Sequence, residues 1–213
     1  MKSSLDNVFV FSPNRQTLGG TAYLIVEKAG NILVDCPAWT SKNEENIRQK
    51  GGVRWLFITH RGGISQNIDA IQSTFNCDVL IQEQEAYLLP NLSAITFCRE
   101  YHFGAGCSAL WTPGHSPGSS CLYRNTGGGI LFSGRHLLPN RQGQLLPLRT
   151  AKTFHWSRQL DNVAKLQSHF TKETLAYLFP GANTGFLQGK TFINNAFEVI
   201  KTLKLNYLRQ ITL

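Results

Sequence analysis

The chain has 213 residues, 42% of them hydrophobic, which is enough to bury one substantial core, so we expect a single domain over residues 1–213. No run reaches the ~18 apolar residues of a membrane span and residues 1–6 lack the apolar core of a signal peptide, which predicts a cytoplasmic protein with no membrane span. Five widely spaced cysteines without a C-x-x-C pair argue against a disulfide framework or a zinc ribbon, and the net charge of +8 favours an anionic partner.

Short β-prone runs alternate with helical segments in the first half of the chain. Ser41 and Glu44 form the pattern of a capping box, in which each side chain satisfies an unpaired amide of the other residue. The helix that starts there is predicted to end at the glycine pair 51–52. We expect strands at residues 8–11, 21–26, 32–35, 53–59 and 77–81, and further helices at 68–75 and 84–89.

The second half of the chain repeats this order. Strands are predicted at residues 109–112, 119–124, 129–133 and 175–179, with a loop that contains proline and glycine at 137–148. Trp156, Leu160, Val163 and Leu166 make the apolar stripe of one helix, and a last helix is expected near residues 190–205. Strands followed by helices, twice over, indicate two sheets with helices packed outside them.

The junctions between strands and loops are the most specific part of the sequence. The stretch T-P-G-H-S-P-G-S at residues 112–119 resembles a motif of the metallo-β-lactamase superfamily, and five other junctions in the same order are similar to those of that family. These are residues 20–25 (GTAYLI), 32–37 (ILVDCP), 57–60 (FITH), 131–134 (LFSG) and 178–181 (LFPG). The resemblance covers nearly the whole chain and implies an α/β fold of the α+β kind, a four-layer αββα sandwich.

The resemblance also implies metal ligands, and most of them are replaced here. The family's H-x-H-x-D-H signature stands as residues 60–65 (HRGGIS), so His60 is kept, while Gly62, Ile64 and Ser65 occupy the other ligand positions. His115 is kept in the third motif. Arg135 stands where the family has a bridging aspartate, and Ala182 replaces the final histidine. Asp35 is also kept, and in the family it is usually structural.

Two histidines are too few for a catalytic metal. Zinc in such sites takes about three protein ligands plus water. Two unit charges about 4 Å apart repel by roughly 4 kcal/mol at an effective dielectric of 20, so a divalent ion beside the Arg135 guanidinium meets about twice that repulsion. We therefore expect no resident metal or other cofactor, and no metal-activated water for hydrolysis.

Other side chains offer alternatives. One zinc held by His60, His115 and His136 is the main one, because three histidines can hold a catalytic zinc, although neighbours on a strand point to opposite sides. A Ser65–histidine pair would resemble a nucleophilic site, but no oxyanion donor or orienting carboxylate can be assigned to it. We interpret Ser65 as a small residue at a lost ligand position.

The charge pattern suggests what the altered site does. Residues 101–160 contain no acidic residue but several basic ones. We therefore expect a non-hydrolytic protein whose metal-free cleft, with His60, Arg61, Ser65, His115 and Arg135, binds a small anionic molecule or a protein partner. The alternatives are a hydrolase of thioesters, lactones or phosphoesters with a rebuilt single-metal site and, third, a nucleic-acid-binding module. Nucleic acid is the least favoured partner, because the basic residues are not interleaved with aromatic ones.

Overall fold

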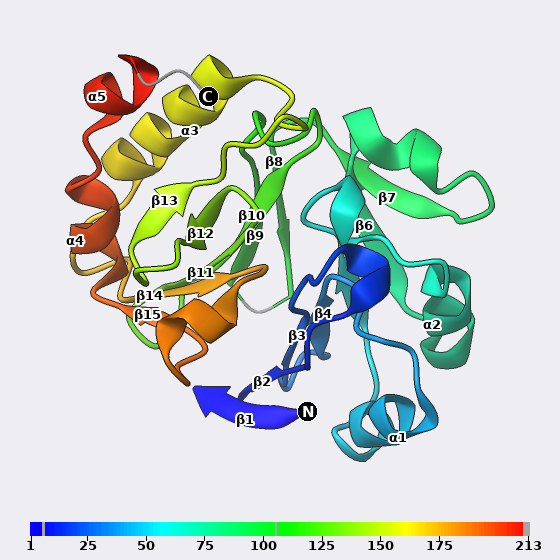
Figure 1. Ribbon diagram of the computed structural model, residues 1–213. Coiled ribbons are helices and arrows are strands. Elements are labelled where there is room, and N and C mark those ends of the chain that lie inside the picture. Colours follow the sequence, from blue (N-terminus) through cyan, green and yellow to red (C-terminus); the bar gives the residue numbers. More distant parts are fainter. Residues whose placement is uncertain (6, 105, 211–213) are drawn as a thin grey trace.

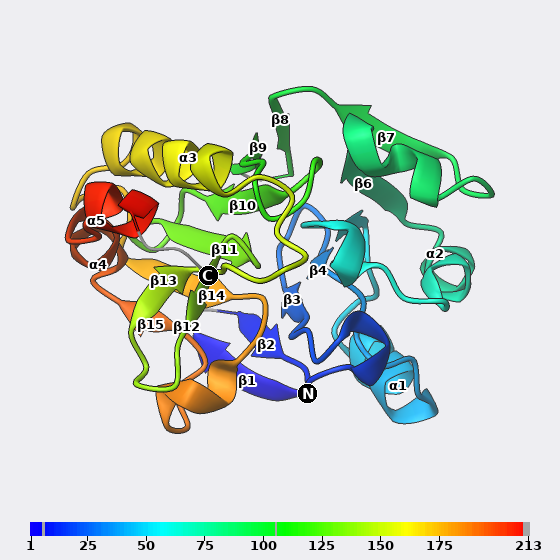
Figure 2. The ribbon, with the colours of Figure 1, turned by 45° about the horizontal axis from the view of Figure 1, so that its top comes forward.

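Two β-sheets face each other, with helices on their outer faces, in the computed structural model, which describes residues 1–5, 7–104 and 106–210 (Figure 1). Helices α1 (Ser41–Gln49) and α2 (Ile68–Phe75) lie outside one sheet, and α3 (Trp156–His169), α4 (Ala196–Lys201) and α5 (Leu205–Gln210) lie outside the other (Figure 2). The expected αββα sandwich is therefore confirmed.

The first sheet is seven-stranded within the described residues and follows the chain order. Its strands are β1 (Lys2–Leu5), β2 (Val8–Val10), β3 (Tyr23–Ile25), β4 (Ile32–Val34), β5 (Trp55–Phe57), β6 (Asp78–Gln82) and β7 (Ala94–Phe97). Strands β1 to β4 pair antiparallel, whereas β4 to β7 pair parallel. The loops that follow β4 and β5 consequently leave the sheet at the same edge.

The second sheet has six strands in the described part of the chain. Their order is β15 (Ile193–Asn194), β14 (Tyr177–Pro180), β11 (Ile130–Gly134), β10 (Ser120–Arg124), β9 (Cys107–Trp111) and β8 (Glu100–Phe103). Strands β11 and β14 pair parallel, so the loops after them also meet at one edge. A separate hairpin, β12 (Leu137–Pro139) and β13 (Leu145–Pro147), follows β11.

Three apolar clusters hold the layers together. Between the sheets, Tyr23 packs edge-on against Phe132 and Phe179, at ring-centroid distances of 5.5 and 5.2 Å. Ile47 and Ile71, from α1 and α2, are fully buried against the outside of the first sheet, and Val163 of α3 is fully buried against the second. Burial of apolar side chains on both faces of each sheet is the main stabilising contribution.

Several expected elements differ from the structure. The N-cap of α1 is Thr40, whose hydroxyl accepts from the amide of Asn43, so the capping box predicted at Ser41 is wrong by one residue, and Glu44 pairs with Arg48 instead. The expected loop 137–148 contains the β12–β13 hairpin. The last helix is interrupted, because residues 193–194 form β15 and two short helices follow.

Other differences are smaller. The helix expected at 84–89 is a 3-10 helix, η3 (Glu83–Leu88), and strands β1, β7 and β8 were not predicted. These strands are short and only partly buried, so they lack the apolar run that identifies a buried strand. In residues 1–5, 7–104 and 106–210, no helix has both the length and the apolar character that crossing a membrane requires.

Candidate anion site

A cavity of about 680 Å³ opens where the carboxyl ends of β5 and β11 approach each other. Six of its lining residues carry polar or charged side chains: His60, Arg61, His115, Arg135, Thr150 and Lys152. The remaining lining residues include Leu18, Gly62, Leu88 and Leu148. The structure therefore brings four of the five predicted ligand-binding residues into one cavity.

His60 is held by a chain of hydrogen bonds that begins at a buried carboxylate. Asp35 accepts from the Thr59 amide at 2.8 Å and from the Thr59 hydroxyl at 2.7 Å. The same hydroxyl lies 2.8 Å from Nδ1 of His60. Since an ionised carboxylate can only accept, the Thr59 hydroxyl donates to Asp35 and must accept from Nδ1–H of His60. This assigns the His60 proton to Nδ1 and leaves Nε2 as a hydrogen-bond acceptor.

The carboxylate at the start of this chain lies in a tightly packed position. Asp35 is 5% exposed, and its φ of 58° belongs to the left-handed region that aspartate tolerates better than most residues. A Cβ at Gly63 would lie 2.1 Å from Oδ1 of Asp35, so only glycine fits there. Burial raises the pKa of Asp35 to about 6, although the Thr59 hydrogen bonds and Arg135 oppose that rise. Asp35 is consequently ionised at neutral pH.

Nε2 of His60 faces Gly62, which has no side chain. A Cβ at Gly62 would lie 2.8 Å from Nε2, so any larger residue there would crowd that nitrogen. Nε2 is buried and has no hydrogen-bond partner within the described residues. Burial lowers the pKa of His60 well below its usual value, and His115, Arg135 and Arg61 lower it further. The imidazole is therefore neutral and offers a lone pair.

His115 lies on the opposite side of the cavity, in the loop between β9 and β10. Its ring centroid is 5.2 Å from that of His60, at an interplanar angle of 67°. Gly114 lets this loop lie directly on α3, because a Cβ there would lie 2.3 Å from the backbone of Gln159. Burial, helped by Arg135 and Arg61, lowers the pKa of His115 to about 4, and its Nδ1 lacks a partner among the described residues.

Arg135 follows β11 and points its guanidinium across the cavity mouth. Its Nη2 donates to the carbonyls of Thr17 and Leu18 at 2.9 and 2.8 Å, while its buried Nε has no partner in the described part of the chain. No ion pair of the described residues includes Arg135, so the position is not neutralised by a directly bonded carboxylate. Burial lowers the pKa of Arg135, which Asp35 partly offsets. A guanidinium nevertheless remains charged at neutral pH.

Two other predicted residues lie elsewhere. Ser65 does not line this cavity but lines a neighbouring one, where its hydroxyl accepts from the Asn67 amide; its expected role beside His60 and His115 is therefore not supported by its position. His136 is 1% exposed, lies in the turn between β11 and β12, and does not line the cavity. Burial lowers the pKa of His136 to about 3, and neither ring nitrogen has a partner among the described residues.

The residues of this site do not fit the two metals of the related fold. Across the described residues, no group of three or more His, Cys, Asp or Glu side chains is arranged to hold a metal ion, so His60, His115 and His136 do not form the alternative zinc site. The positions that would complete the site are Gly62, Ile64, Ser65, Arg135 and Ala182. None of these side chains is a typical zinc ligand, and Arg135 adds a positive charge.

The available groups suit a hydroxylated oxyanion. Guanidinium groups donate to charged oxygens, and neutral imidazoles with bare nitrogens accept from an O–H group. Three buried nitrogens around the cavity, Nε2 of His60, Nδ1 of His115 and Nε of Arg135, lack partners within the described residues. Buried polar groups are normally hydrogen-bonded, so these atoms have donor and acceptor capacity that the described residues leave unused.

Some parts of the site were not anticipated. Thr59 connects Asp35 to His60, and its place immediately before the histidine was the available signal. The carbonyls of Thr17 and Leu18 that anchor Arg135 lie in a turn more than one hundred residues away along the chain, and no sequence pattern indicates that contact. Lys152 also lines the cavity, and no motif in the sequence marks it.

Comparison with known proteins supports the fold. No family model and no curated protein matches the chain. Among solved structures, a metallo-β-lactamase family protein from Thermus thermophilus aligns with a TM-score of 0.67 at 15% identity, over 96% of this chain and 80% of that one. An archaeal metallo-β-lactamase superfamily protein from Sulfolobus tokodaii gives 0.62 at 9% identity, over 98% and 90%. A quorum-quenching N-acyl homoserine lactone lactonase gives 0.58 at 18% identity, over 85% and 93%.

Identities this low establish the fold alone. The chain has the metallo-β-lactamase fold over most of its length, which confirms the expectation from its junction motifs. One fold hosts many chemistries, so a shared fold at such low identity does not indicate a shared function. The side chains of the cavity are more informative.

Proposed function

We propose that this protein binds a small oxyanion carrying a hydroxyl group, such as hydrogen phosphate, in the cavity between His60, His115 and Arg135, without hydrolysing it. The observation that carries the proposal is the set of unpartnered buried nitrogens, one on each of these residues. A guanidinium stands where the related fold places a metal-bridging carboxylate, so the charge that the site attracts is reversed.

Donor nitrogens of Arg135 and the acceptor nitrogen of His60 contact different groups of the ligand. Nη2 of Arg135 donates to the backbone carbonyls of residues 17 and 18, and these two hydrogen bonds fix the plane of the guanidinium. Nε of Arg135 is then the group that donates to an anionic oxygen of the ligand. His60 is neutral with its proton on Nδ1, so Nε2 can only accept, and the ligand must bring an O–H donor. Arg61 and Lys152 add positive charge at the mouth.

Calorimetric titration with phosphate and with sulfate tests this division. Both anions are attracted by Arg135, but sulfate carries no proton at neutral pH and cannot donate to Nε2 of His60. We expect phosphate to bind about tenfold more tightly than sulfate, since a hydrogen bond to a buried group is worth roughly 1 to 2 kcal/mol. Arg135→Ala should abolish measurable binding of both.

Arg158 offers a matched control, because it also lies within residues 101–160, which contain no acidic residue. Arg158 stacks on Trp111, with its guanidinium carbon 4.9 Å from the ring centroid, and does not line the cavity. Arg158→Ala should therefore bind phosphate as the wild type does. Negligible phosphate binding by the wild type, or equal binding by the wild type and Arg135→Ala, would exclude the proposal.

A hydrolase with a rebuilt metal site is the competing function, and the geometry does not favour it, because no group of His, Cys, Asp or Glu side chains in the described residues is arranged to hold a metal ion. We expect no turnover of lactam, thioester or phosphodiester substrates that disappears in both His60→Ala and His115→Ala. Robust activity that both substitutions remove would replace the binding function with a catalytic one.

A further inference from the structure

Exposed apolar side chains gather at the mouth of the anion site. Among the described residues, five large hydrophobic side chains are exposed, and three of them belong to segments that line this site. Leu18, 68% exposed, lines the site itself, and Tyr87, 71% exposed, precedes the lining residue Leu88 on η3. Phe154, 50% exposed, ends the lining segment before α3, and its amide donates to the carbonyl of His115 at 3.1 Å. Single exposed hydrophobic residues are ordinary, but three around one cavity indicate a contact surface.

The backbone of Leu18 is strained. This residue follows the 3-10 helix η1 (Arg15–Thr17) with a φ of 54°, in the left-handed region that glycine adopts most readily. Its carbonyl accepts from Nη2 of Arg135 at 2.8 Å, so the backbone is fixed to the anion site. A strained leucine that leaves most of its side chain exposed does not favour folding, which points to a contact outside the chain.

Positive charge surrounds the same mouth. Arg61 and Lys152 line the site and are exposed, and none of the lining residues is acidic. No ion pair of the described residues includes either side chain. These two cations and the three apolar side chains form the rim of the anion site. In Figure 2, η1 (blue), η3 (green) and the yellow segment before α3, which carry most of the rim, lie around the junction of the two sheets.

A bilayer surface fits this rim better than a soluble ligand or a protein does. Tyr87 and Phe154 do not line the cavity, so a molecule confined to the cavity does not account for their exposure. At a membrane surface, aromatic and leucine side chains enter the interface, while lysine and arginine attract anionic lipids. The net charge of +8 acts in the same direction. No single unmodified protein side chain carries both an anionic group and a hydroxyl, which argues against a protein partner.

We propose that the rim docks on a bilayer containing an anionic phospholipid with a hydroxylated headgroup, such as phosphatidylglycerol. The inference rests on the proposed function, because the headgroup occupies the same cavity: its phosphodiester accepts from Nε of Arg135, and a glycerol hydroxyl donates to Nε2 of His60. The volume of about 680 Å³ lies within the range of roughly 300 to 1,000 Å³ usual for ligand sites, so a headgroup larger than phosphate has room.

Vesicles that differ only in the headgroup test this docking. Cosedimentation compares vesicles of phosphatidylcholine alone with vesicles that also contain either phosphatidylglycerol or the same share of phosphatidylethanol, which has the same charge but no headgroup hydroxyl. We expect negligible binding to phosphatidylcholine. Phosphatidylglycerol should bind about fivefold more tightly than phosphatidylethanol, the effect of one hydrogen bond to a buried acceptor. Equal binding of these two anionic lipids would overturn the proposal.

Leu18→Gly tests the apolar part of the rim without endangering the fold, because glycine suits the left-handed conformation. It should weaken binding to phosphatidylglycerol vesicles at least about fivefold, since the leucine no longer enters the interface. Tyr207→Ser is the matched control, because Tyr207 is 63% exposed on α5 and does not line the anion site. Unchanged binding in Leu18→Gly, or an equal loss in both variants, would overturn the proposal.

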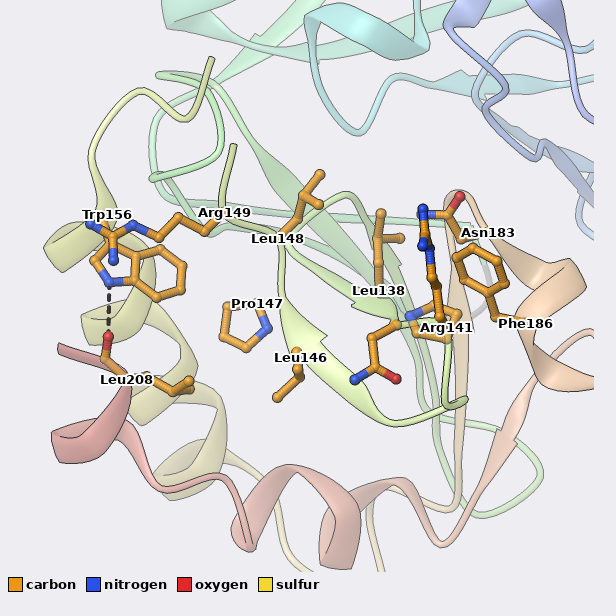
Figure 3. Close-up of a pocket in the computed structure, with 12 residues that line it drawn as sticks. Leu138, Arg141, Leu146, Pro147, Leu148, Arg149, Trp156, Asn183, Phe186 and Leu208 are labelled. Atoms are coloured by element: carbon orange, nitrogen blue, oxygen red, sulfur yellow. Dashed lines mark hydrogen bonds between the residues drawn. The ribbon is translucent and has the colours of Figure 1, made fainter. Parts of the chain in front are cut away.

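Lys152→Ala tests the charge of the rim. Binding to phosphatidylglycerol vesicles should weaken about fivefold, the effect of one cation near an anionic surface. Arg141→Ala is the matched control. Figure 3 shows Arg141 beside Asn183 and Phe186 at a separate cavity of about 410 Å³, whose lining shares only Leu148 with the anion site. Arg141→Ala should bind as the wild type does, and a loss equal to that of Lys152→Ala would indicate nonspecific attraction and overturn the proposal.

The remaining outcomes separate this inference from the proposed function. Arg135→Ala should lose the preference for phosphatidylglycerol over phosphatidylethanol, and a retained preference would overturn the proposal, because the headgroup would then lie outside the cavity. Phosphate binding in solution without vesicle binding would overturn the docking alone and leave the proposed function intact. If soluble glycerophosphoglycerol binds as tightly as the vesicles do, the cavity takes a free ligand, and the bilayer proposal is overturned.

Discussion

Two loops face each other across the anion site, and they differ in what holds their functional side chain. The loop after β5 locks His60 through Thr59 and the buried Asp35, with Gly63 packed against that carboxylate. The loop after β11 holds Arg135 only through two backbone carbonyls of a distant turn. The first loop keeps the frame of the related fold, and the second carries the substitution that reverses its charge.

The contrast shows that a buried carboxylate fixes one side of the cavity, while backbone carbonyls fix the other. Hydrogen bonds and close packing orient His60, and the opposite loop accepts a guanidinium without loss of the fold. The imidazoles of His60 and His115 are buried and neutral, and Nε2 of His60 and Nδ1 of His115 have no partner within the described residues.

The largest expected effect is a loss of folding stability at mildly acidic pH. The pKa values of His60, His115 and His136 are all lowered by burial, so the unfolded chain binds up to three more protons as the pH falls below the usual histidine value. Asp35 opposes this with about one proton, since its pKa is raised to about 6. The free energy of unfolding should fall by roughly 4 kcal/mol from pH 7 to pH 5.

Urea denaturation at a series of pH values measures that loss. His136→Gln removes one of the three titrating groups, so its pH dependence should be about 2 kcal/mol weaker over the same range, whatever its stability at pH 7. A flat profile between pH 7 and pH 5 would mean that the histidines are not held neutral by the fold.

Removal of the locking carboxylate should have the next largest effect. Asp35→Ala leaves the buried amide and hydroxyl of Thr59 without an acceptor and places alanine in a left-handed conformation, which should destabilise the protein by about 3 kcal/mol. Asp35→Asn keeps one acceptor oxygen and tolerates that conformation, so about half of the loss is expected. Thermal unfolding checks both. Equal stability of Asp35→Ala and the wild type would contradict the locking role.

The smallest effect on phosphate binding is expected from removal of the exposed charge of Arg61. Arg61 lines the cavity but is exposed, so water and salt screen its field. Arg61→Ala should weaken phosphate binding only about two- to fourfold, and less at higher salt. The same calorimetric titration, repeated over a range of salt concentrations, measures this. A loss as large as that of Arg135→Ala would show that the two arginines act together.

The sequence was informative where a residue is tied to a strand end. The structure brings His60, His115 and Arg135 around one cavity, because each follows a motif at the end of a strand and such ends meet at one edge of a sheet. Ser65 lines a neighbouring cavity, because the loop after His60 turns tightly through the 3-10 helix 61–63.

Contacts between distant residues could not be predicted in this way. The anchoring of Arg135 by residues 17 and 18 depends on how two loops meet in space, and backbone carbonyls leave no mark in the sequence. The β12–β13 hairpin was missed because each strand has only three residues, with a proline in each.

Mass spectrometry of the untagged protein under non-denaturing conditions tests the central claim most directly. We predict a mass equal to the 23.8 kDa polypeptide without zinc, iron or manganese, together with a phosphate adduct that appears on addition of phosphate and is absent in Arg135→Ala. A species with one or two tightly bound metal ions per chain, retained in Arg135→Ala and unaffected by phosphate, would contradict the account.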